Sequence, residues 1–184
     1  MTTTTSARDR TTSVSLSAPS NPRLQMEPTG SRRTLLDGGW WPRSTDPVAE
    51  LPGLVLAIDN LRGPVTRLVL SAAGWDTHPR RLRVAGRVLR LGYFASQPLS
   101  LLTALCANGD RVDLLVVAPH TTADTALAAM TLAAVTDNVV HAQQILLAAS
   151  TPTPLAGEDA WEDEGGQLGG AVPQRRPTAS TLRS

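Results

Sequence analysis

Two adjacent tryptophans, Trp40 and Trp41, constrain the possible fold more than any other part of the sequence. Neighbouring side chains of an extended strand point to opposite faces, so both indoles can enter one core only if the backbone bends between them. Gly38 and Gly39 permit such a bend because they lack a Cβ, and Pro42 ends the strand because it has no N–H to donate. We therefore expect one indole in the core and the other across a groove or a surface.

Two interpretations of this stretch remain open. Large aromatic side chains contribute to cores more often than they mark sites, so both indoles can simply anchor a helix on a sheet. Alternatively, one indole forms a partly exposed platform beside Arg43, where a planar cation and an aromatic ring offer stacking. The candidate binding residues are then Trp40, Trp41, Arg43 and Trp75.

Alternation of apolar and polar residues predicts about six or seven short strands. They are expected at residues 23–27, 33–36, 65–70, 81–84, 87–91, 100–106 and 111–117. The pair Asn108-Gly109 suits a hairpin turn because both residues tolerate positive φ, and Ala85-Gly86 is a weaker candidate of the same kind. Because such short connections join antiparallel neighbours, the sheet is predicted to be largely antiparallel.

Helical signals occur in three segments, and we expect these helices to cover one face of the sheet. They are expected near residues 46–60, 121–135 and 141–149. Thr45 or Asp46 can cap the first helix, with Pro47 in its first turn, whereas Pro52 predicts a kink or a split into two shorter helices. The predicted fold is a single α+β domain over residues 23–150, because regular strand–helix alternation is absent.

The last predicted strand carries an acid within an apolar run. If Val112 and Leu114 face the core, alternation places Asp113, Leu115 and Val117 on the opposite face of the sheet. Antiparallel sheets commonly leave one face in water. We therefore expect this second face to be exposed and Asp113 to be solvated.

Both ends of the chain are predicted to be disordered. Residues 1–22 are dominated by Thr, Ser and Pro, and residues 151–184 are rich in Gly and acidic residues. Neither segment has the apolar periodicity that offsets the entropy cost of ordering. Trp161, which stands among acidic residues in the second tail, is a candidate short binding motif.

Composition limits the cellular setting and the classes of partner. The lone Cys106 cannot form an intrachain disulfide and is expected to be a buried core thiol. No apolar stretch reaches the roughly 20 residues needed to span a bilayer, and the first residues lack a signal-peptide run. The net charge of +1 argues against a strongly steered nucleic-acid binder. We therefore expect a cytoplasmic protein without a membrane or nucleic-acid partner.

Five segments, in a consistent order, carry a resemblance to a known family. They are residues 37–44 (DGGWWPRS), 50–52 (ELP), 74–76 (GWD), 90–94 (RLGYF) and 113–117 (DLLVV). Over about residues 24–149 they resemble an actinobacterial family of uncharacterised proteins with a domain of unknown function, and the doubled tryptophan followed by Pro-Arg-Ser is the most specific part. The resemblance implies a single domain and no catalytic residue, because that family has no assigned activity.

A hydrolytic or metal site is one alternative function. Asp76 and His78 stand two residues apart, so an extended chain can place both side chains on one face, and His120 is the obvious recruit from elsewhere. The competing interpretation is an aspartate that caps a turn beside a solvated histidine. A metal site needs three or four ligands, and no other cluster of His, Cys or acid has ligand spacing.

A run of arginines suggests another alternative. Five of them, with no acid among them, occur at Arg80, Arg81, Arg83, Arg87 and Arg90. A basic β-ribbon can contact nucleic-acid phosphates. However, all 17 basic residues of the chain are arginine, so a solvent-facing strand would have the same composition.

No motif for phosphate, dinucleotide or zinc binding, and no nucleophile elbow, is present. We therefore expect no cofactor and favour a non-enzymatic binding or regulatory domain for a protein partner or a small ligand.

Overall fold

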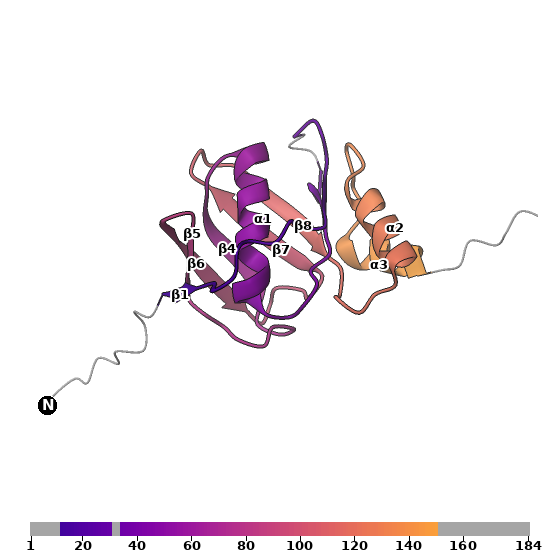
Figure 1. Cartoon of the computed structure of the whole chain (residues 1–184). Helices are drawn as coiled ribbons and strands as arrows, with labels where there is room; N and C mark the ends of the chain where they lie inside the picture. Colours follow the sequence, from indigo (N-terminus) through magenta and orange to yellow (C-terminus); the bar gives the residue numbers. More distant parts are fainter. Residues whose placement is uncertain (1–11, 31–33, 151–184) are drawn as a thin grey trace, which may run out of the picture. The chain divides into compact units, whose positions relative to one another are not determined.

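The computed structural model describes residues 12–30 and 34–150, and these segments form one mixed sheet with three helices (Figure 1). The elements are β1 (Ser13–Val14), β2 (Leu24–Met26), β3 (Gly38–Trp40), α1 (Pro47–Arg62), β4 (Val65–Ser71), β5 (Arg81–Val84), β6 (Arg87–Phe94), β7 (Leu101–Cys106), β8 (Arg111–Val116), α2 (Ala123–Ala133) and α3 (Ala142–Ser150). The predicted α+β class is confirmed. Trp161 and the segments 1–11, 31–33 and 151–184 lie outside the described residues.

The sheet has eight strands in the order β1-β5-β6-β4-β7-β8-β3-β2. The prediction of six or seven largely antiparallel strands is wrong, because β1 with β5, β3 with β8 and β4 with β6 are parallel pairs. All three parallel pairs need connections longer than a hairpin. β3 and β4, which are not neighbours in the sheet, are joined through α1 and also run in the same direction.

The Gly-Gly-Trp strand β3 lies between two other strands. It takes the place beside β2 at which a strand was predicted from residues 33–36. β3 pairs antiparallel with β2 and parallel with β8, so that Trp40 lies opposite both Leu24 and Val116. Thr34 to Leu36 form no strand in the structure. Glycine is usually unfavourable within a strand, but a Cβ on Gly39 would lie 2.8 Å from the Cα of Met130 in α2. The glycine therefore permits α2 to approach the backbone of β3.

Helix α1 begins as the sequence predicts and continues through its second proline. The Asp46 side chain accepts a 2.9 Å hydrogen bond from the backbone N–H of Val48, and Pro47 occupies the first turn. Of the kink or split predicted at Pro52, the split is wrong, since one helix runs from 47 to 62. Burial of Pro52 within the packed core offsets the loss of one helical hydrogen bond.

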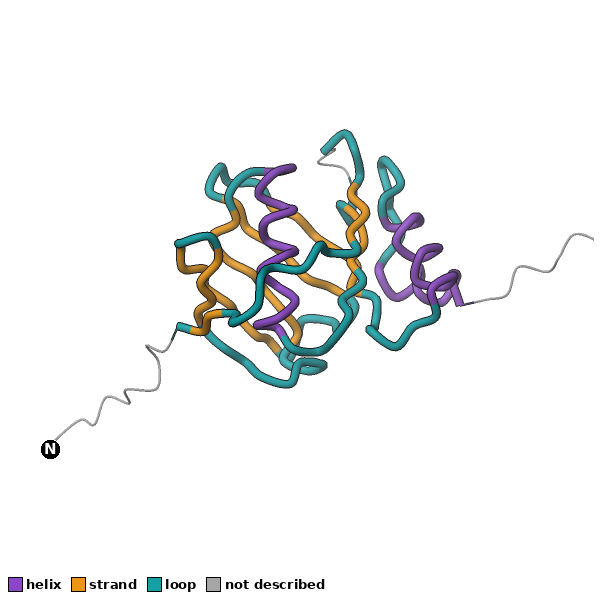
Figure 2. Tube along the Cα trace, in the orientation of Figure 1, coloured by secondary structure: helices purple, strands orange, loops and turns teal. Residues whose placement is uncertain are grey.

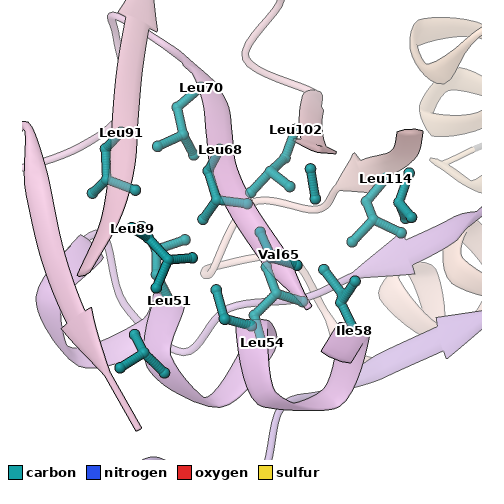
Figure 3. Packing of buried hydrophobic residues seen from close by; sticks show 14 of the residues in the cluster. Leu51, Leu54, Ile58, Val65, Leu68, Leu70, Leu89, Leu91, Leu102 and Leu114 are labelled. Carbon is teal, nitrogen blue, oxygen red and sulfur yellow. The ribbon is translucent and has the colours of Figure 1, made fainter. Parts of the chain in front are cut away.

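Helix α1 packs on one face of the sheet and forms the larger hydrophobic core (Figure 3). Leu51, Leu54 and Ile58 of α1 lie against leucines from the central strands, including Leu68 and Leu102, and all five side chains are fully buried. Cys106 is buried in the same core, as predicted, and this burial raises the pKa of its thiol. Apolar burial therefore fixes α1 on β4 to β8.

Helices α2 and α3 pack on the opposite face, so the prediction that all helices cover one face is wrong. Leu115 and Val117, expected to be exposed, are fully buried against Ala129 and Met130 of α2 and Ile145 of α3. Alternation along β8 therefore supplies leucines to both layers. Only this end of the second face is covered by α2 and α3, and Figure 1 shows both helices beside β8.

An N-terminal segment predicted to be disordered packs on the outside of α1. β1 pairs parallel with β5, and the chain between β1 and β2 passes across α1 (Figure 2). There the carbonyl oxygen of Ser20 lies 2.0 Å from the position that a Cβ on Gly53 would occupy. Residues 50 to 55 of α1 are all buried because the helix lies between this segment and the sheet.

Substitution of Gly53 by alanine tests this packing. Replacing glycine by alanine within a helix ordinarily stabilises a protein by about 0.5–1 kcal/mol. In the full chain we expect Gly53→Ala to lower the melting temperature, because the new methyl group clashes with the backbone at Ser20. In a variant that lacks residues 1–22 the same substitution should raise it. An equal increase in both backgrounds would contradict the packing of this segment on α1.

Candidate functional site

The two adjacent tryptophans enter different layers. Trp40 is 1% exposed and stacks on Trp75, with ring centroids 6.0 Å apart and an interplanar angle of 17°. Trp41 is half-buried and packs against the cluster below α2 and α3, and its indole N–H donates to the carbonyl of Pro119 at 3.3 Å. One indole therefore belongs to the main core and the other lies at the boundary of the second layer.

The cation beside Trp41 is Arg23, a residue that the sequence patterns do not single out. Its guanidinium carbon lies 3.4 Å from the centroid of the Trp41 ring. Its Nε donates to the carbonyl of Trp41 at 2.9 Å and its Nη2 to that of Pro42 at 2.6 Å. Desolvation and repulsion by Arg43 lower the pKa of Arg23. The only available signal was its position just before β2, the antiparallel neighbour of β3.

The side chain of Arg43 forms a hydrogen bond with the N-terminal segment and not with either indole. Its side chain is exposed and donates to the carbonyl of Asn21 at 2.9 Å. The buried carboxylate of Glu50 organises the loop instead, since it accepts hydrogen bonds from the backbone N–H of Arg43 at 3.1 Å and from the Ser44 hydroxyl at 3.0 Å. The motif Pro-Arg-Ser therefore forms a turn held by α1.

A cavity of about 280 Å³ lies where β3, β4 and β8 end. These strands run in the same direction, so the loops that follow them meet at one edge of the sheet, where ligands commonly bind in open α/β sheets. We call this space the carboxyl-end cavity. Its lining residues are Pro42, Ser44, Thr45, Ala73, Gly74, Trp75, Leu99, Ser100, Val116, Ala118, Pro119, His120 and Leu146.

Few polar side chains interrupt this mostly apolar lining. Ser100 is 7% exposed, and its hydroxyl oxygen is buried without a hydrogen-bond partner. His120 is exposed at the end of the loop after β8. A buried hydroxyl without a partner costs free energy, and a polar atom of a ligand can supply the missing hydrogen bond. The cavity therefore combines an indole surface with a buried hydroxyl.

The residues predicted for a metal or hydrolytic site do not form one cluster. Asp76 accepts a 2.8 Å hydrogen bond from the Thr45 hydroxyl, and the His78 ring forms a 2.8 Å hydrogen bond with the carbonyl of Ala72. The ring of His78 also packs edge-on against Tyr93, whereas His120 lines the carboxyl-end cavity. In the part of the chain that the structure describes, no group of three or more potential ligands could hold a metal ion.

The arginine run is divided between the two faces of the sheet. Arg81, Arg83 and Arg90 are exposed on the face opposite α1, because the buried Leu82 and Leu89 take the inner positions. Arg87 forms a short ion pair with Asp59 of α1. Arg80 precedes β5 and lines a surface hollow with Arg67, Arg81 and Arg90.

Two larger hollows, of about 510 and 680 Å³, both border Thr34. Thr34 adjoins residues 31–33, which lie outside the described residues. The larger one contains Asp37, whose carboxylate accepts a 2.7 Å hydrogen bond from the backbone N–H of Asp113. Desolvation raises the pKa of Asp37 despite this bond. Asp113, predicted to be solvated, is half-buried in an ion pair with Arg111 at 2.7 Å.

A known protein family matches the part of the chain that contains most strands of the sheet. The profile of DUF5994, a family of unknown function, matches residues 23–133. The chain belongs to the DUF5994 family. The match contains every residue that lines the carboxyl-end cavity except Leu146. No curated protein and no solved structure matches the chain. Among its described residues, this DUF5994 protein has no helix long and apolar enough to cross a membrane.

Alanine substitution should separate the roles of the two tryptophans in the DUF5994 domain. Trp40→Ala removes a fully buried indole and should lower the free energy of unfolding by about 3–5 kcal/mol. Trp41→Ala should cost less, because its indole is half-buried. Urea denaturation measures both losses, and the exposed Arg43→Ala serves as a control with little effect. Equal losses at positions 40 and 41 would contradict the asymmetry.

The single tyrosine of the chain provides a direct test of its environment. Burial raises the pKa of Tyr93 above its ordinary value of about 10. The unfolded chain then releases this proton at lower pH, so it binds fewer protons than the native protein above about pH 10, and the free energy of unfolding falls as pH rises further. Absorbance titration should show that Tyr93 ionises at a higher pH in the native protein than in denaturant. Coincident curves from natively folded protein would contradict this.

Proposed function

We propose that the protein is a non-enzymatic binding domain that holds a small, mostly apolar ligand in the carboxyl-end cavity. A ring-shaped ligand with one polar group suits the lining best. Trp75 offers an indole surface that is rigidly supported by Trp40, and the polar group of the ligand completes the hydrogen bonding of Ser100. The observation that carries the proposal is this unpartnered, buried hydroxyl at a mostly apolar cavity.

The size of the cavity limits the ligand. Pockets for drug-sized ligands are roughly 300–1,000 Å³. The carboxyl-end cavity measures about 280 Å³, so we infer a ligand of one or two rings. Leu99 is 61% exposed at this site, and covering it would add apolar contact area to the bound state.

The regulatory role and the cytoplasmic location that the sequence suggests are also proposals. A regulatory role is compatible with ligand binding, because occupation of the cavity would link the loops after β3, β4 and β8. We also retain the proposal of a cytoplasmic location, which is supported by the single, buried cysteine. The hydrolytic alternative has less support, since Asp76 and His78 are engaged by Thr45 and Ala72.

Ligand-observed NMR with benzyl alcohol and toluene tests the site. We expect benzyl alcohol to bind more tightly than toluene, because only its hydroxyl can pair with Ser100. Ser100→Ala should weaken binding of benzyl alcohol by about threefold to tenfold, as expected for the loss of one hydrogen bond, and leave toluene unchanged.

A cavity-filling pair of variants provides the control. Ala118→Leu adds volume to the cavity wall and should abolish binding of both compounds. Ala128→Leu makes the same change at an exposed position of α2 that does not line the cavity, and should bind both normally. Failure of both compounds to bind, or binding that survives Ala118→Leu, would overturn the proposal.

A further inference from the structure

The second face of the sheet is only partly covered by helices. α2 and α3 pack on the end formed by β8, β3 and β2. At the other end, β5, β6 and β4 present exposed arginines on the face opposite α1. We call this surface the arginine face; its residues are Arg67, Arg81, Arg83 and Arg90.

Three of these arginines form a row across neighbouring strands. Arg81 of β5 lies opposite Arg90 of β6, and Arg90 lies opposite Arg67 of β4. Like charges directly opposite each other destabilise a sheet. Arg62, Arg87 and Arg111 each pair with a carboxylate. Within residues 12–30 and 34–150, no such ion pair involves the three arginines of the row.

The row borders a hollow that is suited to an anion. Arg67, Arg80, Arg81 and Arg90 line a space of about 270 Å³, with Leu91 at its wall. Arginine recognises phosphate well because its planar guanidinium can donate two parallel hydrogen bonds. Local charge decides such binding at short range, so the small net charge of the whole chain does not exclude it.

An aromatic ring lies next to this hollow. A second hollow of about 420 Å³ shares Arg67, Arg80 and Leu91 with the first and extends to Gly92 and Phe94. A Cβ on Gly92 would lie 2.8 Å from the Phe94 ring and 3.4 Å from Nη2 of Arg67. The glycine therefore allows the ring and the guanidinium to rest side by side on the strand. Phe94 is 43% exposed, which leaves part of its ring accessible.

We propose that the arginine face binds a nucleotide, with its phosphate in the arginine-lined hollow and its base against Phe94. Stacking on an aromatic side chain and charge pairing with the phosphate are the two contacts that nucleotides make at such surfaces. The same chemistry is offered by a free nucleotide and by one unit of a single-stranded nucleic acid. This site shares no lining residue with the carboxyl-end cavity and does not depend on the function proposed for it.

Equilibrium binding by the full chain tests the inference, with ATP, a single-stranded oligothymidylate and inorganic pyrophosphate as probes. We expect saturable binding of ATP or the oligonucleotide that weakens as salt rises, and weaker binding of pyrophosphate because it lacks a base. Phe94→Ala should remove the advantage over pyrophosphate. Tighter binding of ATP identifies a free nucleotide as the natural class, whereas tighter binding of the oligonucleotide identifies a single strand; either result supports the site.

Paired charge variants separate the hollow from general electrostatics. Arg67→Gln with Arg90→Gln should raise Kd by about tenfold or more, because two charge-assisted contacts are lost. Arg43→Gln with Arg111→Gln makes the same change in charge at exposed positions outside the arginine face, and should raise Kd by less than about threefold. Melting temperatures no lower than that of the wild type verify folding. Absence of binding by wild type, equal effects of the two pairs, or pyrophosphate binding as tight as that of ATP would each overturn the proposal.

Discussion

The arrangement of both helical layers depends on the burial of β3 from two sides. Trp40 extends into the core under α1, and the missing side chain of Gly39 lets the backbone of α2 approach the same strand from the other face. Trp41, one residue later, packs with the second layer and is held by Arg23. A larger residue in place of Gly39 would separate α2 from the sheet, and the loops around the carboxyl-end cavity would lose a common support.

Features set by neighbouring residues were predictable from the sequence. The hairpin at Ala85-Gly86 formed as expected, with φ of 49° and 79° at its two positions, which is the geometry of a tight primed turn. The hairpin around Asn108-Gly109 and the Asp46 cap of α1 were also correctly predicted. In each case the determining hydrogen bonds or dihedral angles lie within a few residues of sequence.

Features set by distant parts of the chain were not predictable in the same way. The alternation along β8 is equally compatible with an exposed face and with a second core at Leu115 and Val117. Only the packing of α2 and α3 on this face decides between the two. Likewise, Trp75, a candidate binding residue from the sequence, lines the carboxyl-end cavity, but the loops that complete its wall are separated by dozens of residues. Arg23 became the partner of Trp41 through strand pairing, which no local pattern specifies.

Both outermost strands of the sheet are very short. β1 contributes two residues beside β5, and β2 contributes three residues beside β3. Long unpaired edge strands present backbone donors and acceptors that can recruit another chain and start aggregation. Here each edge offers too few free backbone groups to template a further strand. β1, from which the chain continues across α1, thus covers the edge of β5 with a strand too short to template another.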